Sequence, residues 1–356
     1  MWKSLKDRAE GVKEMKRMKT TEAVGQVLCH DITQIIPGVT KDAVFRKGHI
    51  IREEDIPVLL SVGKDSVYIW ENDETMMHEN DAAEVLYRMT ANEHMHPSDV
   101  KEGKIEAIAD TEGLLKVDRE KLKKVNAFGE MMIATRHGNT VVKKGDKLAG
   151  TRIIPLVIKK DKMQEAEKIC DGTPILKILP FTVKKAAIIT TGNEVYHGRI
   201  KDAFTPVIEQ KIAEFGAEMM FHEIFDDNDR KITDGCLRAI EAGADIVFCT
   251  GGMSVDPDDK TPLAIKNTGA EMISYGSPVL PGAMFLLSYY RKGDKVIPIC
   301  GLPGCAMYNR RTIFDLVLPR LMAADPVTAD ELASLGEGGL CLNCEVCTYP
   351  NCGFGK

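Results

Sequence analysis

The second half of the chain alternates regularly between apolar runs and amphipathic segments, beginning at Lys184. The apolar runs predict strands, and the segments between them predict helices. One helix is expected to have Thr205 as its cap and Pro206 at its first position. This alternation is typical of an α/β fold with a mostly parallel, doubly wound sheet that helices cover on both faces. Strands are expected at 184–192, 217–225, 244–252, 271–290 and 295–304, and helices at 205–216, 229–243, 261–269 and 305–323.

Five segments that follow these strands are rich in glycine, proline, hydroxyl or acidic residues. In a parallel sheet the carboxyl ends of the strands meet at one edge, where ligands bind. Glycines let a backbone come close to phosphate oxygens, and carboxylates are ligands that Mg²⁺ prefers. For one loop alone, a surface turn or a helix cap is the simpler interpretation; five loops at one edge favour a site for an anionic ligand and a metal. The segments are 190–194, 225–229, 250–260, 277–282 and 301–304, with the acids Glu194, Asp226, Asp227, Asp258 and Asp259.

The first half of the chain has a different sequence pattern. Short segments in which apolar and polar residues alternate are separated by glycines and prolines, and two segments have a clear helical pattern. This pattern predicts a β-rich α+β region, with helices near 80–89 and 118–128 and a hairpin turn at Gly145-Asp146. The opening residues predict an amphipathic helix with Trp2, Leu5, Ala9 and Val12 on one stripe. We therefore expect an N-terminal helix at 1–20, the β-rich region at 21–182, the α/β domain at 183–326, and a linker with a cysteine-rich tail at 327–356.

Composition and the N-terminal segment argue against nucleic acid and membranes as partners and against a targeting signal. With 44% hydrophobic and 28% charged residues, the chain is typical of a soluble globular protein, and its net charge of −6 argues against nucleic acid. No apolar run approaches the roughly 18 residues that a membrane helix needs. Acidic residues interrupt the N-terminal segment, which matches neither a signal peptide nor a transit peptide. We expect a cytoplasmic protein with no membrane partner.

The ten cysteines fall into two groups. Six are scattered, several in apolar surroundings typical of reduced core thiols, and Cys249 is one of these rather than a catalyst. The other four follow a C-x2-C-x2-C-x4-C pattern behind a glycine-rich stretch at 336–339 that predicts a flexible tether. Such thiolates suit Zn²⁺ or an iron–sulfur cluster; a thiol-exchange tail and an inert tail are the alternatives. The four are Cys341, Cys344, Cys347 and Cys352.

Four motifs of this sequence resemble those of a known protein family. "ITTGNEV", "DDND", "TGGMSVDPDD" and "CGLPG" occur in the order and spacing of the molybdopterin-binding domain. That domain is shared by the molybdopterin molybdenumtransferases, the gephyrin E-type domains and the molybdopterin adenylyltransferases. The resemblance covers 184 to about 324, and residues 21–75 more faintly resemble the N-terminal part of the transferases.

The resemblance implies roles for individual residues. Glu194 and the pair Asp226 and Asp227 would act around Mg²⁺ and molybdate, with Glu194 and Asp227 as the Mg²⁺ ligands. Asp259 would close the phosphate loop and is grouped with these acids as catalytic. The residues expected to bind the pterin cofactor are Thr191, Gly192, Gly251, Gly252, Ser254, Asp258, Pro281, Gly282, Gly301, Pro303 and Gly304.

The resemblance also implies a reaction. Molybdenum would pass from molybdate to the dithiolene of adenylylated molybdopterin, with Mg²⁺-assisted hydrolysis of the adenylyl group, in a homodimer. The "FDNSAMDGYA"-type segment of the transferases is missing between Pro37 and Pro155, Met284 replaces an expected proline, and Cys305-Ala306 follows the last loop. These departures favour the alternative of a non-catalytic molybdopterin carrier or sensor that serves a molybdoenzyme. A nucleotide-phosphate hydrolase ranks last, because the chain has no Walker lysine.

Overall fold

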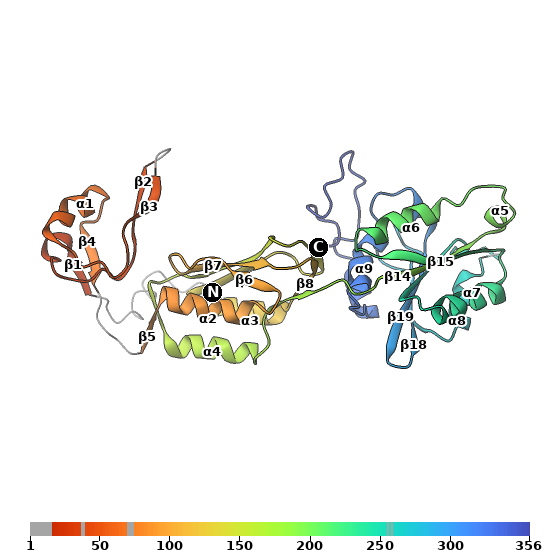
Figure 1. Ribbon diagram of the computed structural model, residues 1–356, viewed down its shortest axis with the longest axis horizontal. Coiled ribbons are helices and arrows are strands. Elements are labelled where there is room, and N and C mark those ends of the chain that lie inside the picture. The colour runs from red at the N-terminus through yellow and green to blue at the C-terminus, as the bar shows by residue number, and fades with distance from the viewer. Residues whose placement is uncertain (1–15, 37–39, 70–74, 255, 258) are drawn as a thin grey trace.

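The computed structural model describes residues 16–36, 40–69, 75–254, 256–257 and 259–356. Three parts follow one another along the long axis of the molecule: an N-terminal part (16–69), a middle part (75–179) and a C-terminal part (185–356) (Figure 1). Each part has its own buried apolar core. Within the described ranges, no helix has both the length and the apolar character needed to cross a bilayer.

The N-terminal part is built from two antiparallel strand pairs and short helices. Residues 1–15 of the expected N-terminal helix lie outside the described residues, and its last residues form a strand instead, with Lys16 opposite Ile69. The core contains Leu28, Ile32 and Leu59. The elements are β1 (Lys16–Lys19), η1 (Thr20–Glu22), β2 (Ile32–Ile36), β3 (Thr40–Phe45), η2 (Glu53–Asp55), α1 (Ile56–Ser61) and β4 (Ser66–Ile69).

The middle part has the expected α+β character, with helices packed on antiparallel strands. Its sheets have the orders β6-β7-β11-β9, β10-β8-β13 and β12-β5. The turn at Gly145 exists, but the predicted hairpin is wrong, because β10 pairs with β8 while β11 pairs with β7 and β9. The elements are β5 (Met76–His78), α2 (Glu79–Thr90), β6 (Met95–Pro97), β7 (Lys104–Ala109), β8 (Gly113–Val117), α3 (Arg119–Ala127), β9 (Met131–Thr135), β10 (Thr140–Val142), β11 (Lys147–Ile153), β12 (Val157–Lys159), α4 (Lys160–Cys170) and β13 (Leu176–Leu179).

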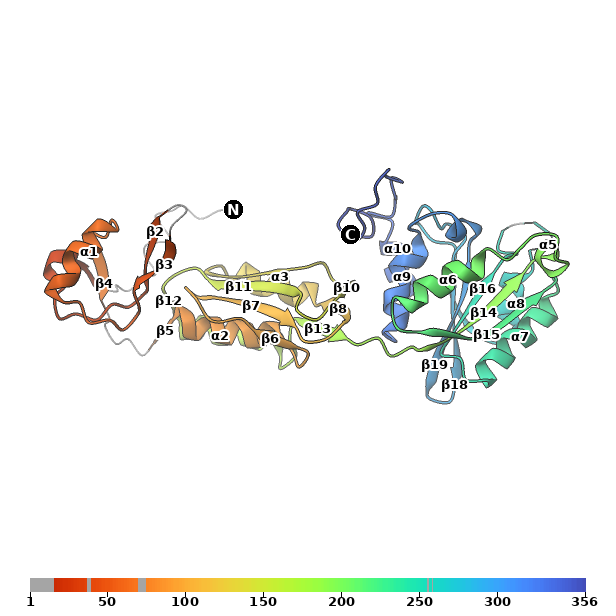
Figure 2. The ribbon, with the colours of Figure 1, turned by 45° about the horizontal axis from the view of Figure 1, so that its top comes forward.

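The C-terminal part confirms the predicted α/β class. Its six-stranded sheet has the order β15-β14-β16-β19-β18-β17, and β18 is antiparallel to both of its neighbours. Helices α6 and α9 cover one face and α7 and α8 the other, as Figure 2 shows. The elements are β14 (Lys185–Thr191), α5 (Asn193–Tyr196), α6 (Phe204–Ala213), β15 (Glu218–Phe225), α7 (Asp229–Glu241), β16 (Ile246–Thr250), α8 (Thr261–Asn267), β17 (Glu271–Tyr275), β18 (Leu286–Lys292), β19 (Lys295–Leu302), η3 (Gly304–Met307), α9 (Ile313–Met322) and α10 (Ala329–Ser334).

Two helix starts differ from the prediction. Helix α6 begins at Phe204, and Asp202, two residues earlier, accepts the backbone N–H groups of Phe204 at 2.8 Å and Thr205 at 3.2 Å through its Oδ1. Thr205 lies inside the helix, and its hydroxyl donates to the same carboxylate at 2.6 Å. Helix α9 starts at Ile313 rather than at Cys305, because Thr312 and Asp315 form a reciprocal capping box.

The tail is not the separate, tethered segment that the glycines predicted. Residues 329–334 form α10, and Phe354 is only 5% exposed in the core that covers α9. A Cβ on Gly338 would lie 2.5 Å from the carbonyl oxygen of Lys356, and one on Gly339 would lie 2.4 Å from that of Leu335. The glycines of this stretch permit close backbone packing rather than freedom of movement.

Candidate functional site

The five loops leave the sheet at the same edge, as expected. The strand register places Thr191 opposite Phe225, and Thr250 opposite both Thr190 and Leu302. Leu286, at the start of the antiparallel β18, lies opposite Gly301 and Tyr275. The carboxyl ends of β14, β15, β16, β17 and β19 therefore coincide, and the segments after them form one continuous rim, which we call the carboxyl edge.

The glycine pair after β16 is held tightly against β14. Gly251 and Gly252 have φ values of +82° and +53°, and a Cβ on Gly251 would lie 2.1 Å from the carbonyl oxygen of Thr191. The Thr191 hydroxyl donates to the Thr250 carbonyl at 3.1 Å, and the Thr261 hydroxyl donates to the Gly251 carbonyl at 2.9 Å. Only glycine fits at Gly251, and the turn is fixed before any ligand binds.

Two further contacts shape the start of this loop. The Tyr275 hydroxyl donates to the Met253 carbonyl at 3.1 Å, and burial raises the pKa of that tyrosine, with a further contribution from Asp259. Asp259 accepts the backbone N–H of Asp256 at 2.9 Å, which fits its expected role of closing the loop. Ser254 is exposed beside them, and Asp258 lies outside the described residues.

The loops after β14 and β15, which carry three of the acids, are joined by a hydrogen bond. Asp227 accepts the backbone N–H of Asn193 at 3.1 Å, so it fixes the start of α5 and with it Glu194. Glu194 is exposed, and its Oε2 lies only 3.4 Å from where a Cβ on Gly192 would be. Gly192 itself has a φ of +132°. Glu194, Asp226 and Asp227 thus come from two adjacent loops of the carboxyl edge.

The two carboxylate oxygens of Asp226 have different surroundings. Its Oδ2 accepts from Lys231 Nζ at 2.8 Å, and this hydrogen bond raises the pKa of Lys231. Its Oδ1 is buried and has no hydrogen-bond partner. Among the described residues, the only other buried side-chain oxygen or nitrogen without a partner is Thr250 Oγ1, at the end of β16. Because buried polar atoms are nearly always satisfied, these two oxygens at one edge are open to a hydrogen bond or a coordinate bond from a group that is not part of the chain, such as a water, an ion or a ligand.

Two of the expected pterin-binding glycines have a packing reason of their own. A Cβ on Gly282 would lie 2.3 Å from Ile313 Cγ2, and one on Gly301 would lie 2.5 Å from Met253 Cε. Both positions are buried, as is Pro303, whereas Pro281 is half-buried and Gly304 is exposed with open space around it. Of these five residues, Gly304 is the most accessible to a ligand.

A polar cluster that no sequence motif indicates lies between β14, β15 and the start of α6. The Thr190 hydroxyl donates to Asp202 Oδ2 at 2.9 Å and lies 3.2 Å from His222 Nε2. Burial alone would raise the pKa of Asp202, but hydrogen bonds from Thr205, Thr190 and Phe204 hold it below its usual range. An aspartate just before a helix was the available signal, whereas the histidine reaches the cluster only through strand pairing.

The cysteines separate as predicted into core and tail groups. Cys249 is fully buried with its Sγ 3.6 Å from that of Cys236, and the hydrogen bond between them together with burial raises its pKa. The tail cysteines all line one cavity of about 620 Å³. Throughout the part of the chain that the structure describes, no three His, Cys, Asp or Glu side chains are grouped closely enough to bind one ion.

Two protein families match parts of this chain. A family described as a probable molybdopterin binding domain matches residues 187–323, which include the five loops of the carboxyl edge. DUF8806, a domain of unknown function, matches residues 17–71. The C-terminal part is therefore similar to molybdopterin-binding domains, while the likeness of residues 21–75 to the molybdenumtransferases stays a prediction.

Curated relatives carry a different name. A competence-damage inducible protein of Bacillus cereus (strain B4264) is 30% identical over 129 residues, which are 36% of this chain and 30% of the relative. A relative of the same name in Bacillus subtilis (strain 168) is 32% identical over 85 residues, or 24% of this chain and 20% of the relative. The chain thus spans less than a third of the length of these relatives.

Solved structures are similar only at low scores. The tungsten cofactor synthesizing protein MoaB from Pyrococcus furiosus has 20% identity and a TM-score of 0.32, covering 39% of this chain and 89% of its own. The molybdopterin biosynthesis Mog protein from Mycobacterium ulcerans has 16% identity and a TM-score of 0.30, covering 42% and 99%. A molybdenum cofactor biosynthesis protein from Pyrococcus furiosus has 12% identity and a TM-score of 0.24, covering 88% and 64%. Because these scores are low, the assignment of the fold is based on the strand order and the core of this chain itself.

Proposed function

We propose that the carboxyl edge binds molybdopterin and that the protein inserts molybdate into adenylylated molybdopterin in a Mg²⁺-dependent reaction. The observation that carries the proposal is the buried, unpartnered Oδ1 of Asp226 beside the loop that bears Glu194. A carboxylate oxygen that the protein leaves unsatisfied in a buried position is suited to a ligand or a cation. The match of residues 187–323 to a probable molybdopterin binding domain supports molybdopterin as the ligand.

We assign the phosphate of the pterin to the glycine pair Gly251-Gly252. Both carbonyl groups already accept hydrogen bonds from Thr261, from its hydroxyl at 2.9 Å and from its backbone N–H at 3.3 Å. These bonds orient the carbonyls toward α8, so that an anion at this turn would meet N–H groups rather than carbonyl oxygens. The edge then binds the negatively charged end of the cofactor.

Glu194, Asp226 and Asp227 supply the carboxylate oxygens that Mg²⁺ prefers, and because these side chains do not already surround one site, the ion would have to draw them together. When bound, the ion would polarise the phosphates of the adenylylated substrate. The chain's own residues do the positioning. Asp227 holds the N–H of Asn193 and thereby the short helix that carries Glu194, while Lys231 binds one oxygen of Asp226 and leaves the other available.

A second candidate is a non-catalytic molybdopterin carrier or sensor that serves a molybdoenzyme. Four acids were expected to be catalytic, namely Glu194, Asp226, Asp227 and Asp259. The observation that favours a carrier is that three of these four already bind groups of this chain. Asp226 pairs with Lys231, Asp227 with the Asn193 N–H, and Asp259 with the Asp256 N–H. In a carrier these acids would shape the loops and nothing more. The homodimer remains a prediction from the family resemblance under either candidate.

The test is AMP release from adenylylated molybdopterin in the presence of molybdate and Mg²⁺. The enzyme proposal expects release that requires Mg²⁺ and falls by at least about tenfold in Glu194→Gln and Asp226→Asn, since a lost metal ligand costs at least that factor. Glu209→Gln, an exposed carboxylate on α6, is the matched control and should keep full activity. Pterin binding without AMP release would favour the carrier, and the absence of both binding and release would overturn the two candidates together.

A further inference from the structure

The cysteine-rich tail forms a loop that the fold closes at both ends. At its first end, Leu280 donates its N–H to the Gly339 carbonyl at 2.9 Å and accepts the Cys341 N–H at 2.8 Å. At its second end, the Tyr349 hydroxyl donates to the Asp315 carbonyl at 3.2 Å, and Phe354 is buried in the core. The Arg311 guanidinium lies 4.8 Å from the centre of the Tyr349 ring. The chain between these anchors carries the four tail cysteines.

The four thiols share one cavity but differ in how firmly they are held. Cys341 and Cys352 are half-buried and pack against the core below α9, whereas Cys344 and Cys347 are exposed. The turn that bears the exposed pair is held to the body by the hydrogen bond from Arg310 Nη1 to the Glu345 carbonyl at 3.0 Å. Arg310 and Arg311 line the same cavity, and the Arg311 guanidinium is paired with Asp315 at 2.8 Å.

We propose that Cys341, Cys344, Cys347 and Cys352 together bind one metal centre in this cavity, as four thiolates. Their spacing suits a tetrahedral Zn²⁺ or an iron–sulfur cluster, and the shared chemistry is four-thiolate ligation. Each thiol loses its proton on binding, and Arg310, which donates to the Glu345 carbonyl within the same turn, brings positive charge toward the thiolates, whereas the Arg311 charge is already paired with Asp315. The described side chains are not yet grouped around an ion, so binding requires the Cys344–Cys347 turn to move inward onto the fixed pair.

The fold lowers the entropic cost of this step. A metal that joins four cysteines in a free tail must close every loop between them from an open chain. Here the two anchors already hold Cys341 and Cys352 on the same surface, and only the short turn that bears Cys344 and Cys347 has to move. The tail is therefore preorganised for a metal in a way that its length alone would not allow.

The centre would also stabilise a loop of the carboxyl edge. Cys341 is bonded through its own N–H to Leu280, and Leu280 directly precedes Pro281 and Gly282 in the segment 277–282. A metal that fixes Cys341 therefore fixes this pairing and the loop beside it. This inference does not depend on the identity of the ligand at the carboxyl edge.

The test uses the full chain, purified without oxygen and loaded separately with Zn²⁺ or with Fe²⁺ and sulfide. About one tetrahedral Zn²⁺ or one cluster per chain is expected. Visible absorption identifies a cluster, and replacing Zn²⁺ with Co²⁺ gives the absorption of a thiolate-ligated ion. Cys344→Ser/Cys347→Ser should lose the metal and keep its fold, because both side chains are exposed. Cys305→Ser, a half-buried cysteine outside the cavity, should keep the metal.

Two outcomes would overturn the proposal. One is a chain that stays metal-free under both loading conditions while its melt remains cooperative. The other is equal metal content in the double variant and in the wild type, which would indicate an adventitious ion. The effect on the edge has its own readout: exchange of the Leu280 amide should slow on metal loading in the wild type and not in the double variant. Unchanged exchange in the loaded wild type would contradict the stabilisation of the 277–282 loop.

Discussion

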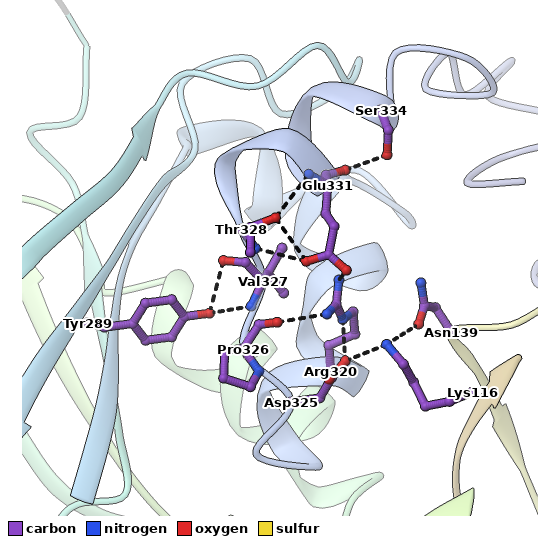
Figure 3. A network of polar contacts seen from close by, with 10 residues as sticks. All are labelled: Lys116, Asn139, Tyr289, Arg320, Asp325, Pro326, Val327, Thr328, Glu331 and Ser334. Carbon is purple, nitrogen blue, oxygen red and sulfur yellow. Dashed lines mark hydrogen bonds and ion pairs between the residues drawn. The ribbon is translucent and has the colours of Figure 1, made fainter. Parts of the chain in front are cut away.

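Lys116 and Asp325, which are 209 positions apart in the chain, form an ion pair with 2.8 Å between Nζ and Oδ2 (Figure 3). Lys116 belongs to β8 of the middle part, and Asp325 follows α9 of the C-terminal part. Arg320, only 6% exposed, donates to the same carboxylate and also pairs with Glu331 at 2.8 Å. Because the Arg320 charge is buried, these carboxylates are required to balance it, and the network fixes the joint between the two parts.

Replacing Arg320 should weaken this joint. Arg320→Met keeps the bulk of the side chain but leaves Asp325 and Glu331 without their buried partner, so we expect a loss of about 3 kcal/mol in the free energy of unfolding. Urea unfolding followed by circular dichroism measures this loss. Arg119→Met, an exposed arginine on α3, is the control and should change stability by less than about 0.5 kcal/mol. Equal effects of the two substitutions would contradict the assignment.

The same network predicts how stability depends on pH. Burial alone would raise the pKa values of Asp325 and Glu331, but hydrogen bonds and ion pairs with Arg320 and Lys116, and the backbone N–H of Thr328, hold both below their usual ranges. A carboxyl whose pKa is lower in the folded state stabilises the fold above its unfolded pKa, and that contribution is lost as the pH falls through the folded pKa. We therefore expect stability to fall as the pH drops below about 4.

A variant isolates this contribution. In Asp325→Asn the decline below about pH 4 should be shallower than in the wild type, because one of the carboxyls that gains protons on unfolding is gone. Urea midpoints measured between neutral and acidic pH give the comparison. Identical slopes in the two proteins would show that Asp325 does not contribute to the acid sensitivity.

The glycine at position 251 should be irreplaceable. In Gly251→Ala the new Cβ would meet the Thr191 carbonyl oxygen at 2.1 Å in a backbone conformation with φ at +82°. The strain of the left-handed backbone conformation and the overpacking together should lower the free energy of unfolding by about 3 kcal/mol. Gly145→Ala is a matched control, because Gly145 has a φ of +88° and nothing within 4 Å of the new Cβ, so it should cost only about 1 kcal/mol. Thermal melts of the two variants test the difference.

The tail should contribute to the stability of the C-terminal part. Phe354→Ala removes a ring that is 5% exposed, and we expect a loss of about 3 kcal/mol. Leu342→Ala changes a tail side chain that is 78% exposed and should be nearly neutral. A detached tail, as the glycine pattern suggested, would instead make both substitutions neutral in a urea titration.

The sheet and its edge could be predicted because their signals are local. A buried parallel strand such as β16 is apolar as far as Cys249, and the glycine pair directly after Thr250 marks the end of the strand. The predicted start of α9 at Cys305 is wrong because the segment from Gly304 to Met307 forms a separate 3-10 turn, and the capping box at Thr312 begins a new helix. That box was readable in the sequence, since a threonine is followed three residues later by an aspartate.

The docking of the tail could not be predicted in the same way. It depends on the pairing of Leu280 with Gly339 and Cys341 and on the burial of Phe354, which are contacts between segments far apart in the chain. Glycines near Gly338 are equally compatible with a flexible tether and with tight backbone packing, and only the neighbours decide between them. The Asp202–His222 contact was hidden for the same reason.

The hydroxyl contacts that hold Gly251 and Gly252 have a consequence for the thermodynamics of binding. Thr191 and Thr261, whose hydroxyl oxygens are 3.1 Å apart, fix this turn in the free protein. A ligand that meets the turn there does not have to order it, so little conformational entropy is lost on association. Affinity at the carboxyl edge should then depend mainly on the contacts made with the ligand, and the heat capacity change should reflect the buried surface rather than coupled folding.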